Sequence, residues 1–249
     1  MVEKKKKKHQ AKATSKPDRS LNPVKNLTRE ERVKRVYKAL LNDFKIPKRF
    51  EGKNFDNYQP SEKNKKGFAR VKKYAENFEE RFQNGDWLLM TGGYGLGKTH
   101  LALAAAKEIL KYFAVKHIDR NPNQIYYAGA TEKIIFTTSS ELIQDIRDSY
   151  DSDNVNEQEV MNRFKTTPLL IIDDLGTEKA SEWQQEKMYI ILDYRYRELL
   201  PTIITTNLEW EELENHISLR VIERMIEAAG HGKYLRKFQG KSYRRSQND

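Results

Sequence analysis

The stretch TGGYGLGKTH at residues 91–100 combines glycines with a lysine and a threonine in the spacing Gly-x-x-x-x-Gly-Lys-Thr. Glycines allow the backbone of such a loop to turn its N–H groups toward the phosphates of a nucleotide. We expect Lys98 to contact the β- and γ-phosphates of ATP or ADP, and Thr99 to bind Mg²⁺. An apolar strand before the loop and a helix after it are the context that this interpretation requires. The expected nucleotide-binding residues are Gly92, Gly93, Tyr94, Gly95, Leu96, Gly97, Lys98, Thr99 and His100.

Two carboxylates follow an apolar run in the segment LLIIDD at residues 169–174. Ligands bind an open α/β sheet at the carboxyl ends of its parallel strands, which is where this run would deliver both side chains. We expect Asp173 to hold Mg²⁺ through water, and Asp174 to orient or deprotonate the attacking water. The alternative is a strand that ends in a solvated acidic turn.

A third run, TIITTN at residues 202–207, ends in an amide side chain. Asn207 can lie near the γ-phosphate and hold the water that Asp174 polarises. An isolated asparagine at the end of a strand is more often an ordinary turn residue. The role of Asn207 as a catalytic residue therefore depends on the two runs that precede it.

The elements that must position these residues alternate along the chain between short apolar strands and helices. Such alternation implies right-handed crossovers and a mainly parallel sheet that is covered on both faces. We therefore expect an α/β fold of three layers, built as a phosphate-loop domain around a mainly parallel central sheet. The expected strands cover 87–91, 133–137, 169–173 and 202–206, and the expected helices cover 68–82, 98–113, 140–150 and 182–199.

The net charge of +10 belongs to the first 40 residues, which contain 14 Lys and Arg against 4 Asp and Glu. Residues 1–26 are low in apolar side chains and are expected to be disordered. Thr28 and Glu31 then form a capping box that starts an amphipathic helix. The apolar stripe of this helix, from Val33 to Leu41, predicts packing either on its own chain or in the groove of a partner protein.

The composition also excludes several classes of protein and site. The chain has no cysteine, so it forms no disulfide and no thiolate zinc site. Its longest run of leucine and isoleucine, Leu169–Ile172, is far too short to cross a bilayer, and no apolar stretch follows the N-terminal lysines as in a signal peptide. We expect a soluble cytoplasmic protein with no membrane partner.

Six segments of the chain carry a resemblance to a known family. They are GGYGLGKTHLA (92–102), LLIIDDLGTE (169–178), LPTIITTNL (200–208), LRVIERM (219–225), GKSYRR (240–245) and IPKRFEGKNFDNY (46–58). Together they resemble the AAA+ ATPases of the DnaC-type helicase-loader group, which includes the IstB-type transposition helpers. The resemblance extends over about residues 46–246.

The resemblance assigns roles to two arginines. Arg224 matches the arginine finger that reaches the γ-phosphate of a neighbouring subunit, and Arg244 matches the sensor arginine that acts within its own subunit. A finger that acts in trans requires an ATP-dependent homo-oligomer. Asp174 stands where many AAA+ proteins have glutamate, which predicts slow hydrolysis. The short chain after Asn207 indicates that the C-terminal helical lid of larger AAA+ enzymes is missing.

The resemblance also implies a domain organisation and a function. Residues 1–45 form a basic arm with the amphipathic helix for partner binding, 46–67 form a linker, and 68–249 form the AAA+ ATPase domain with a basic tail. The leading hypothesis is an ATP hydrolase that loads a hexameric replicative DNA helicase onto single-stranded DNA, in the cytoplasm of a bacterial or phage-infected cell. The alternative is an IstB-like helper that binds duplex DNA and a transposase. A small-molecule kinase fits less well, because Asn207 and Arg224 are typical of a hydrolase.

The segments that contact DNA are less well marked. The expected helix at 140–150 is acidic, so charge does not favour it. The N-terminal arm and the basic tail are better candidates for binding phosphates, with Tyr234 and Phe238 available to stack on bases. The alternative is that the tail packs back on the ATPase core. The basic residues of the tail are Lys233, Arg236, Lys237, Lys241, Arg244 and Arg245.

Overall fold

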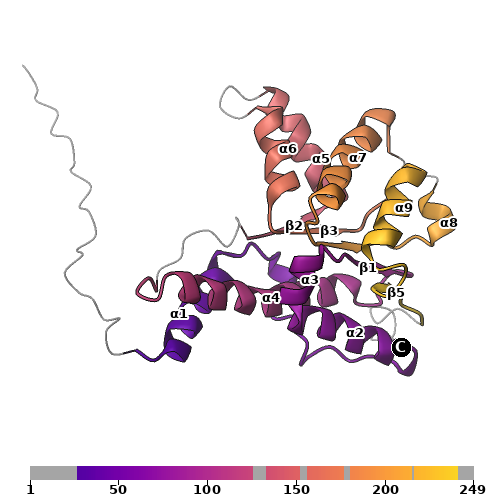
Figure 1. The fold of residues 1–249 in the computed structure, drawn as a ribbon. Coiled ribbons are helices and arrows are strands. Elements are labelled where there is room, and N and C mark those ends of the chain that lie inside the picture. Colours follow the sequence, from indigo (N-terminus) through magenta and orange to yellow (C-terminus); the bar gives the residue numbers. More distant parts are fainter. Residues whose placement is uncertain (1–26, 126–132, 152–155, 177–179, 215, 241–249) are drawn as a thin grey trace, which may run out of the picture.

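A five-stranded parallel sheet forms the centre of the protein, with the strand order β2-β3-β4-β1-β5 (Figure 1). The computed structural model describes residues 27–125, 133–151, 156–176, 180–214 and 216–240. The prediction of a mainly parallel sheet is confirmed. The strands are β1 (Leu88–Thr91), β2 (Ile134–Thr138), β3 (Leu169–Asp173), β4 (Thr202–Thr205) and β5 (Leu235–Lys237).

Helices cover both faces of this sheet (Figure 1). The helices α1 to α4 lie on one face, and α5, α6, α7 and α9 lie on the other, so the predicted three-layer architecture is confirmed. In the described part of the chain, α8, α9 and β5 follow β4, and no separate helical lid is present. The helices are α1 (Arg29–Asp43), α2 (Lys65–Glu76), α3 (Phe78–Asn84), α4 (Lys98–Arg120), α5 (Ser139–Asp148), α6 (Glu157–Thr166), α7 (Glu182–Arg197), α8 (Trp210–Leu213) and α9 (Leu219–Ala228), and the 3₁₀ turns are η1 (Lys48–Phe50), η2 (Glu62–Asn64) and η4 (Ser149–Asp151).

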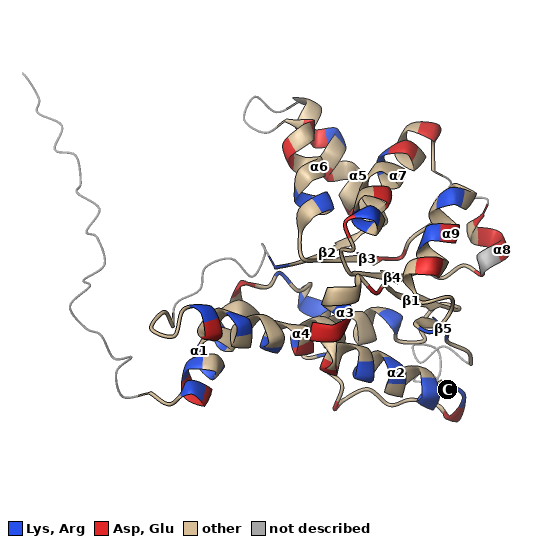
Figure 2. Ribbon diagram, in the orientation of Figure 1, with Lys and Arg blue, Asp and Glu red and all other residues tan. Residues whose placement is uncertain are grey.

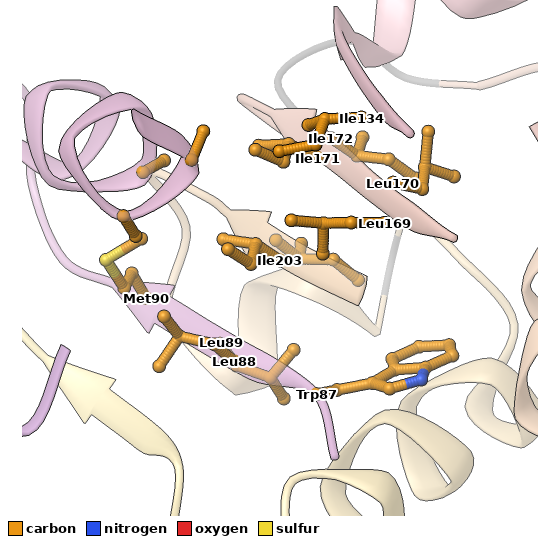
Figure 3. Close-up of a cluster of buried hydrophobic side chains, with 14 of the residues drawn as sticks. Trp87, Leu88, Leu89, Met90, Ile134, Leu169, Leu170, Ile171, Ile172 and Ile203 are labelled. Atoms are coloured by element: carbon orange, nitrogen blue, oxygen red, sulfur yellow. The ribbon is translucent and has the colours of Figure 1, made fainter. Parts of the chain in front are cut away.

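The central strands are apolar on both faces because helices cover both faces (Figure 3). Every residue of β3 is buried, and Ile203 of β4 lies in register between Ile171 of β3 and Leu88 of β1. Trp87 is fully buried at the start of β1, where its indole N–H donates a 3.0 Å hydrogen bond to the carbonyl of Leu200. These contacts fix the ends of β1, β3 and β4 relative to one another.

The amphipathic helix α1 packs on its own chain, against α4. Its capping box at Thr28 is formed, Val36 and Leu40 are buried in the common core, and Arg29 pairs with Asp119 of α4 at 2.6 Å. Of the two alternatives for the apolar stripe, the structure therefore has the intramolecular one. The helix α4 runs past the predicted end at residue 113, because its C-terminal turns lie along α1.

Three parts of the chain differ from the expected elements. The expected helix at 68–82 is two helices, α2 and α3, which meet at Asn77 with backbone angles of φ −108° and ψ 34°. Three helices, α6, α8 and α9, and the strand β5 were not predicted. Tyr234, just before β5, and Phe238, just after it, are both buried. The expectation that they stack on bases is therefore wrong. The described part of the tail packs on the core instead.

No helix in the described part of the chain is both long enough and apolar enough to cross a bilayer.

Candidate nucleotide-binding site

The phosphate loop lies between the end of β1 and the start of α4. Gly92 and Gly97 have φ angles of 124° and 84°, a backbone region that side chains rarely adopt. Both positions are also crowded: a Cβ at Gly92 would lie 2.1 Å from the carbonyl oxygen of Phe238, and one at Gly97 would lie 2.5 Å from the ring of Tyr58. Glycine is therefore required at both positions by conformation and by space.

The amine of Lys98 lies on the inner side of this loop. It donates hydrogen bonds of 2.6 and 2.9 Å to the carbonyls of Gly92 and Gly93, and one of 2.7 Å to Oδ1 of Asn207. Lys98 is buried, and its position at the N-terminus of α4 is the one at which a loop of this kind meets phosphates. The structure therefore brings Lys98 and Asn207 together.

Asp173 is buried at the end of β3, among hydroxyl groups. Thr99 donates to its carboxylate, with Oγ1 3.0 and 2.9 Å from the two oxygens, and Thr205 Oγ1 lies 2.5 Å from Oδ1. Burial raises the pKa of the Asp173 carboxyl, although hydrogen bonds from Thr205 and Thr99 oppose this shift. Burial deprives the ionised carboxylate of water, and a bound cation would supply the stabilisation that water no longer gives.

These oxygens fit a magnesium ion that is shared with a nucleotide. Mg²⁺ prefers oxygen ligands and is usually bound by one or two protein groups together with phosphates and water. The hydroxyl of Thr99 and the carboxylate of Asp173 are adjacent and would supply those two groups. Within the described residues no cluster of three or more His, Cys, Asp or Glu forms a cage for a metal, so the phosphates would have to complete the site.

Asp174 follows in a left-handed backbone conformation with a φ of 61°. Its N–H donates to Thr205 Oγ1 at 3.0 Å, and its carbonyl accepts from Ser139 Oγ at 3.0 Å. The amide of Asn207 donates to its carboxylate. Lys98, Asn207 and Asp174 thus form one chain of polar contacts, which the alternative of a solvated acidic turn does not describe.

A cavity of about 790 Å³ opens over these groups. Its volume lies within the range of small-molecule and cofactor pockets. The phosphate loop with Asp173, Asp174 and Asn207 forms one part of its wall, and residues within 49–64 form another. The arrangement can bind a nucleotide, with its phosphates on the loop.

The wall at 49–64 was expected to be part of a linker, and the structure shows how it is attached. Tyr58 donates a 3.0 Å hydrogen bond to the carbonyl of Leu96, and its ring packs edge-on against His100. His100 Nε2 lies 2.8 Å from the carbonyl of Asn54, and burial lowers the pKa of His100. The aromatic residues of this segment were visible in the sequence, but their packing partners were not.

Arg224 lies outside this cavity in the described chain. It projects from α9 onto α7, where it pairs with Asp193 and stacks over the rings of Tyr189 and Tyr196 at 5.3 and 5.6 Å. Arg244 lies outside the described residues. The structure thus brings together the loop, Asp173, Asp174 and Asn207, and leaves Arg224 on a different surface.

Thr205 is a further site residue that the sequence did not single out. Its hydroxyl contacts both Asp173 and the backbone of Asp174, from the neighbouring strand β4. The signal in the sequence was the pair of threonines before Asn207, which places a hydroxyl at the buried end of a strand.

The chain is similar to curated replicative helicase loaders. It is 23% identical to the replicative helicase loader DnaC of Escherichia coli (strain K12) over 173 residues, which are 69% of this chain and 62% of that protein. It is 25% identical to the replicative helicase loader DnaI of Bacillus subtilis (strain 168) over 152 residues, which are 61% of this chain and 42% of that protein. The matched region is therefore less than two thirds of either relative.

Solved structures share the fold. The crystal structure of the DnaC helicase loader aligns with a TM-score of 0.61 at 25% identity and covers 78% of this chain and 100% of that one. AMPPCP-bound DnaA from Aquifex aeolicus aligns with a TM-score of 0.56 at 21% identity and covers 81% of this chain and 54% of that one. The second likeness shows the fold alone.

These similarities confirm the resemblance to AAA+ ATPases of the DnaC and IstB group. The family model described as "IstB-like ATP binding protein" matches residues 2–249. That match takes in nearly the whole chain and includes every residue of the cavity. The chain therefore belongs to the family of IstB-like ATP-binding proteins.

Proposed function

We propose that this protein is an ATP hydrolase that binds a hexameric replicative DNA helicase and loads it onto single-stranded DNA, with assembly driven by ATP and release driven by hydrolysis. The observation that supports the proposal best is the chain of contacts from Lys98 through Asn207 to Asp174, in a protein similar to replicative helicase loaders. A site that only bound a nucleotide would need neither the carboxylate nor the amide at this place.

Each residue of the site has one task in the proposed reaction. Lys98 would leave the carbonyls of the loop for the phosphates and neutralise their charge. Asn207, released from Lys98, would hold the attacking water beside the γ-phosphate. Asp174 would take up a proton from that water while the water oxygen bonds to the γ-phosphorus. The bond between the γ-phosphorus and the β-phosphate oxygen would break at the same time, which releases ADP and phosphate.

Magnesium belongs to the same proposal. Thr99 and Asp173 would hold Mg²⁺, which supplies positive charge to the β- and γ-phosphate oxygens when bound. Burial keeps the Asp173 carboxylate poorly solvated, so a cation is its natural partner. Thr205 keeps this carboxylate at the end of β3.

Two arginines complete the proposed cycle between subunits. Arg224 would act as a finger on the nucleotide of a neighbouring subunit, and Arg244 would act as a sensor within its own. In the isolated chain Arg224 pairs with Asp193, so assembly would have to exchange that partner for a phosphate. Hydrolysis would therefore depend on formation of the homo-oligomer.

The parts of the chain that contact the helicase are assigned by the same proposal. Residues 1–45 would contact the helicase, residues 46–67 would connect this arm to the nucleotide cavity, and residues 68–249 would hydrolyse ATP. The apolar stripe of α1 is used within the chain, so its exposed basic side chains, such as Lys34 and Lys38, are the ones open to a partner.

The test is a loading assay with the hexameric replicative helicase of the source cell and circular single-stranded DNA. We expect the protein to bind the helicase with ATP and to increase the amount of helicase on the circle. Lys98→Ala should do neither, and Asp174→Asn should bind the helicase but release it slowly. No association with the helicase, under conditions in which ATP binds, would contradict the proposal.

A second candidate function is a transposition helper, because the matching family model is that of IstB-like proteins. Such a helper would use the same nucleotide site, but would bind duplex DNA and a transposase. Formation of ATP-dependent filaments on duplex DNA, with no effect on the helicase, would favour this function over loading.

A further inference from the structure

At the contact between α2 and β5 lies an arginine, Arg236, two of whose donor atoms have no acceptor among the described residues. Residues Tyr234, Arg236 and Phe238 alternate along β5, and the outer two pack on α2: Tyr234 against Tyr74 with ring centroids 5.6 Å apart, and Phe238 against Gly67. Arg236 lies between them. Its Nε and Nη2 atoms are buried and have no hydrogen-bond partner among the described residues.

The surroundings of Arg236 are basic. Burial and the nearby Arg70 of α2 lower the pKa of Arg236 to about 10, so it stays charged at neutral pH. In the described chain its nearest acceptors are the carbonyls of Gly232 and Leu235, which Nη1 uses. Arg236 is half-buried, and a guanidinium with two unmet donors beside a second guanidinium is unfavourable unless an anion lies near both.

A stripe of exposed basic side chains lies along α2, beside its contact with β5. At 3.6 residues per turn, Lys66, Arg70 and Lys73 fall within about 60° of one another around the helix. Among the described residues none of the three forms an ion pair. The other two lysines of α2 differ, because Lys65 pairs with Glu62 and Lys72 pairs with Glu76. Figure 2 shows Lys and Arg recurring along α2, beside β5.

The spacing of the stripe suits a row of phosphates. Lys66 and Lys73 are about 10 Å apart along the helix at 1.5 Å per residue. That length spans two to three phosphates of a nucleic acid strand. The stripe has no exposed aromatic side chain, so it offers charge and hydrogen bonds without stacking. Contacts of this kind position a protein on a strand without reading its sequence.

We propose that the α2–β5 stripe, defined as Lys66, Arg70, Lys73 and Arg236, binds the phosphodiester backbone of DNA. This inference rests on the proposed function, because helicase loading also requires the protein to meet DNA. It adds the surface that would contact the DNA. By contrast, α5 carries Glu141, Asp145 and Asp148 against Arg147. The stripe, with four basic residues and no paired carboxylate, is the better site for an anionic backbone.

The test measures binding of a labelled single-stranded 30-mer, and of its duplex, by fluorescence anisotropy with the full chain. The salt concentration is varied from about 50 to 200 mM, because released counterions give the slope of log K against log salt. The key variant is Lys66→Glu with Lys73→Glu. Its matched control is Lys65→Glu with Lys72→Glu, which changes the same charge on the same helix but on another face.

We expect the Lys66/Lys73 variant to bind DNA about tenfold or more weakly and to lose about 2 units of salt slope. The Lys65/Lys72 control should stay close to the wild type. Arg236→Gln should also weaken DNA binding. Arg236→Lys should weaken it less, because lysine keeps the positive charge but lacks the paired N–H donors of the guanidinium. Circular dichroism of each variant establishes that the fold is kept.

Four outcomes would overturn the proposal. Equal losses in the two lysine variants would mean that only net charge matters. Unchanged DNA binding in the Lys66/Lys73 variant would assign the DNA to another surface, with the loading function intact. Binding of labelled polyglutamate that is lost in the same variant would assign the stripe to an acidic protein. If the wild type bound no DNA at all, the proposed loading function would fail together with the stripe.

Discussion

The hydroxyl of Thr205 lies 2.5 Å from Oδ1 of Asp173, so the neighbouring strand β4 holds the carboxylate that ends β3. The same hydroxyl accepts a hydrogen bond from the N–H of Asp174 at 3.0 Å. One buried side chain thus positions both carboxyl-bearing residues of the site. This role depends on the register of β3 and β4, in which Ile172 lies opposite Ile204.

Replacing Thr205 by valine keeps the shape and removes both hydrogen bonds. We expect a loss of about 1–3 kcal/mol in the free energy of unfolding, because the N–H of Asp174 is left without its acceptor. The concentration of Mg²⁺ needed for half-maximal ATP hydrolysis should rise, since Asp173 loses a donor. Thr205→Ser should restore both. Normal Mg²⁺ dependence in Thr205→Val would show that Thr205 does not position the metal ligand.

The buried carboxylate of Asp173 should make the apoprotein less stable at neutral pH than at acid pH. Burial raises its folded pKa above the ordinary value of 3.8, so the native state binds the extra proton between the two values. The contribution of this group to the free energy of unfolding therefore falls as the pH rises through that window. At pH 7 we expect Asp173→Asn to melt at a higher temperature than the wild type without nucleotide.

Melting curves between pH 4 and pH 8 check this expectation. The difference between Asp173→Asn and the wild type should shrink as the pH falls through the raised pKa of Asp173, because the wild-type carboxyl then becomes neutral as well. Asp119→Asn, which removes an exposed carboxylate, should change little at any pH. A lower melting temperature for Asp173→Asn at pH 7 would mean that hydrogen bonds outweigh burial.

Arg195 is fully buried and holds together three segments of the fold. Its guanidinium donates to the carbonyls of Phe164, Lys165, Thr167 and Pro201 and to Thr202 Oγ1, over 2.5 to 3.1 Å. Burial lowers its pKa to about 9. Arg195→Met leaves these acceptors unpaired, and we expect a loss of roughly 3 kcal/mol or more by denaturant titration.

A matched control for Arg195 lies on the same helix. Arg197 is exposed and pairs with Asp193 at 2.9 Å, so Arg197→Met should change the free energy of unfolding by less than about 0.5 kcal/mol. Similar losses in the two variants would contradict the assignment of Arg195 as the residue that joins the ends of α6 and β4.

Arg224 tests whether the active site is shared between subunits. Arg224→Ala should bind ATP normally and hydrolyse it about 10³-fold more slowly, as expected for the loss of an arginine finger. Lys98→Ala should be inactive because it lacks its own phosphate contact. Mixing the two inactive variants should restore part of the activity, since an intact loop can then meet an intact finger.

The control for Arg224 is Arg220→Ala, because Arg220 is exposed on the same helix α9. Its ATPase rate should match the wild type. A mixture of Arg224→Ala and Lys98→Ala that recovers no activity, although both assemble, would indicate that Arg224 serves only its ion pair with Asp193.

Local patterns predicted the loop and the carboxylates, because each lies next to a strand whose apolar run is continuous in the sequence. The alternation of strands and helices likewise predicted the parallel sheet. The role of Thr205 could not be predicted in this way, since it depends on which strand lies beside β3. Such pairings are set by contacts between distant parts of the chain.

The burial of the C-terminal aromatic residues could not be predicted from the sequence either. Tyr234 and Phe238 stand among basic residues, which suggests an exposed surface for stacking. They are buried because β5 pairs with β1 and packs on α2. Both of these elements lie far earlier in the chain. The aromatic residues before the loop were recognised as anchors, but only the fold shows that Tyr58 contacts Leu96 and His100.

The most direct test of the central claim measures the ATPase rate and the particle mass of the full chain with ATP, in the absence of DNA, with single-stranded DNA and with duplex DNA. The account predicts assembly and faster hydrolysis that are selective for single strands, neither of which Lys98→Ala should show. Hydrolysis that is insensitive to DNA, in particles that remain monomeric with ATP, would contradict it.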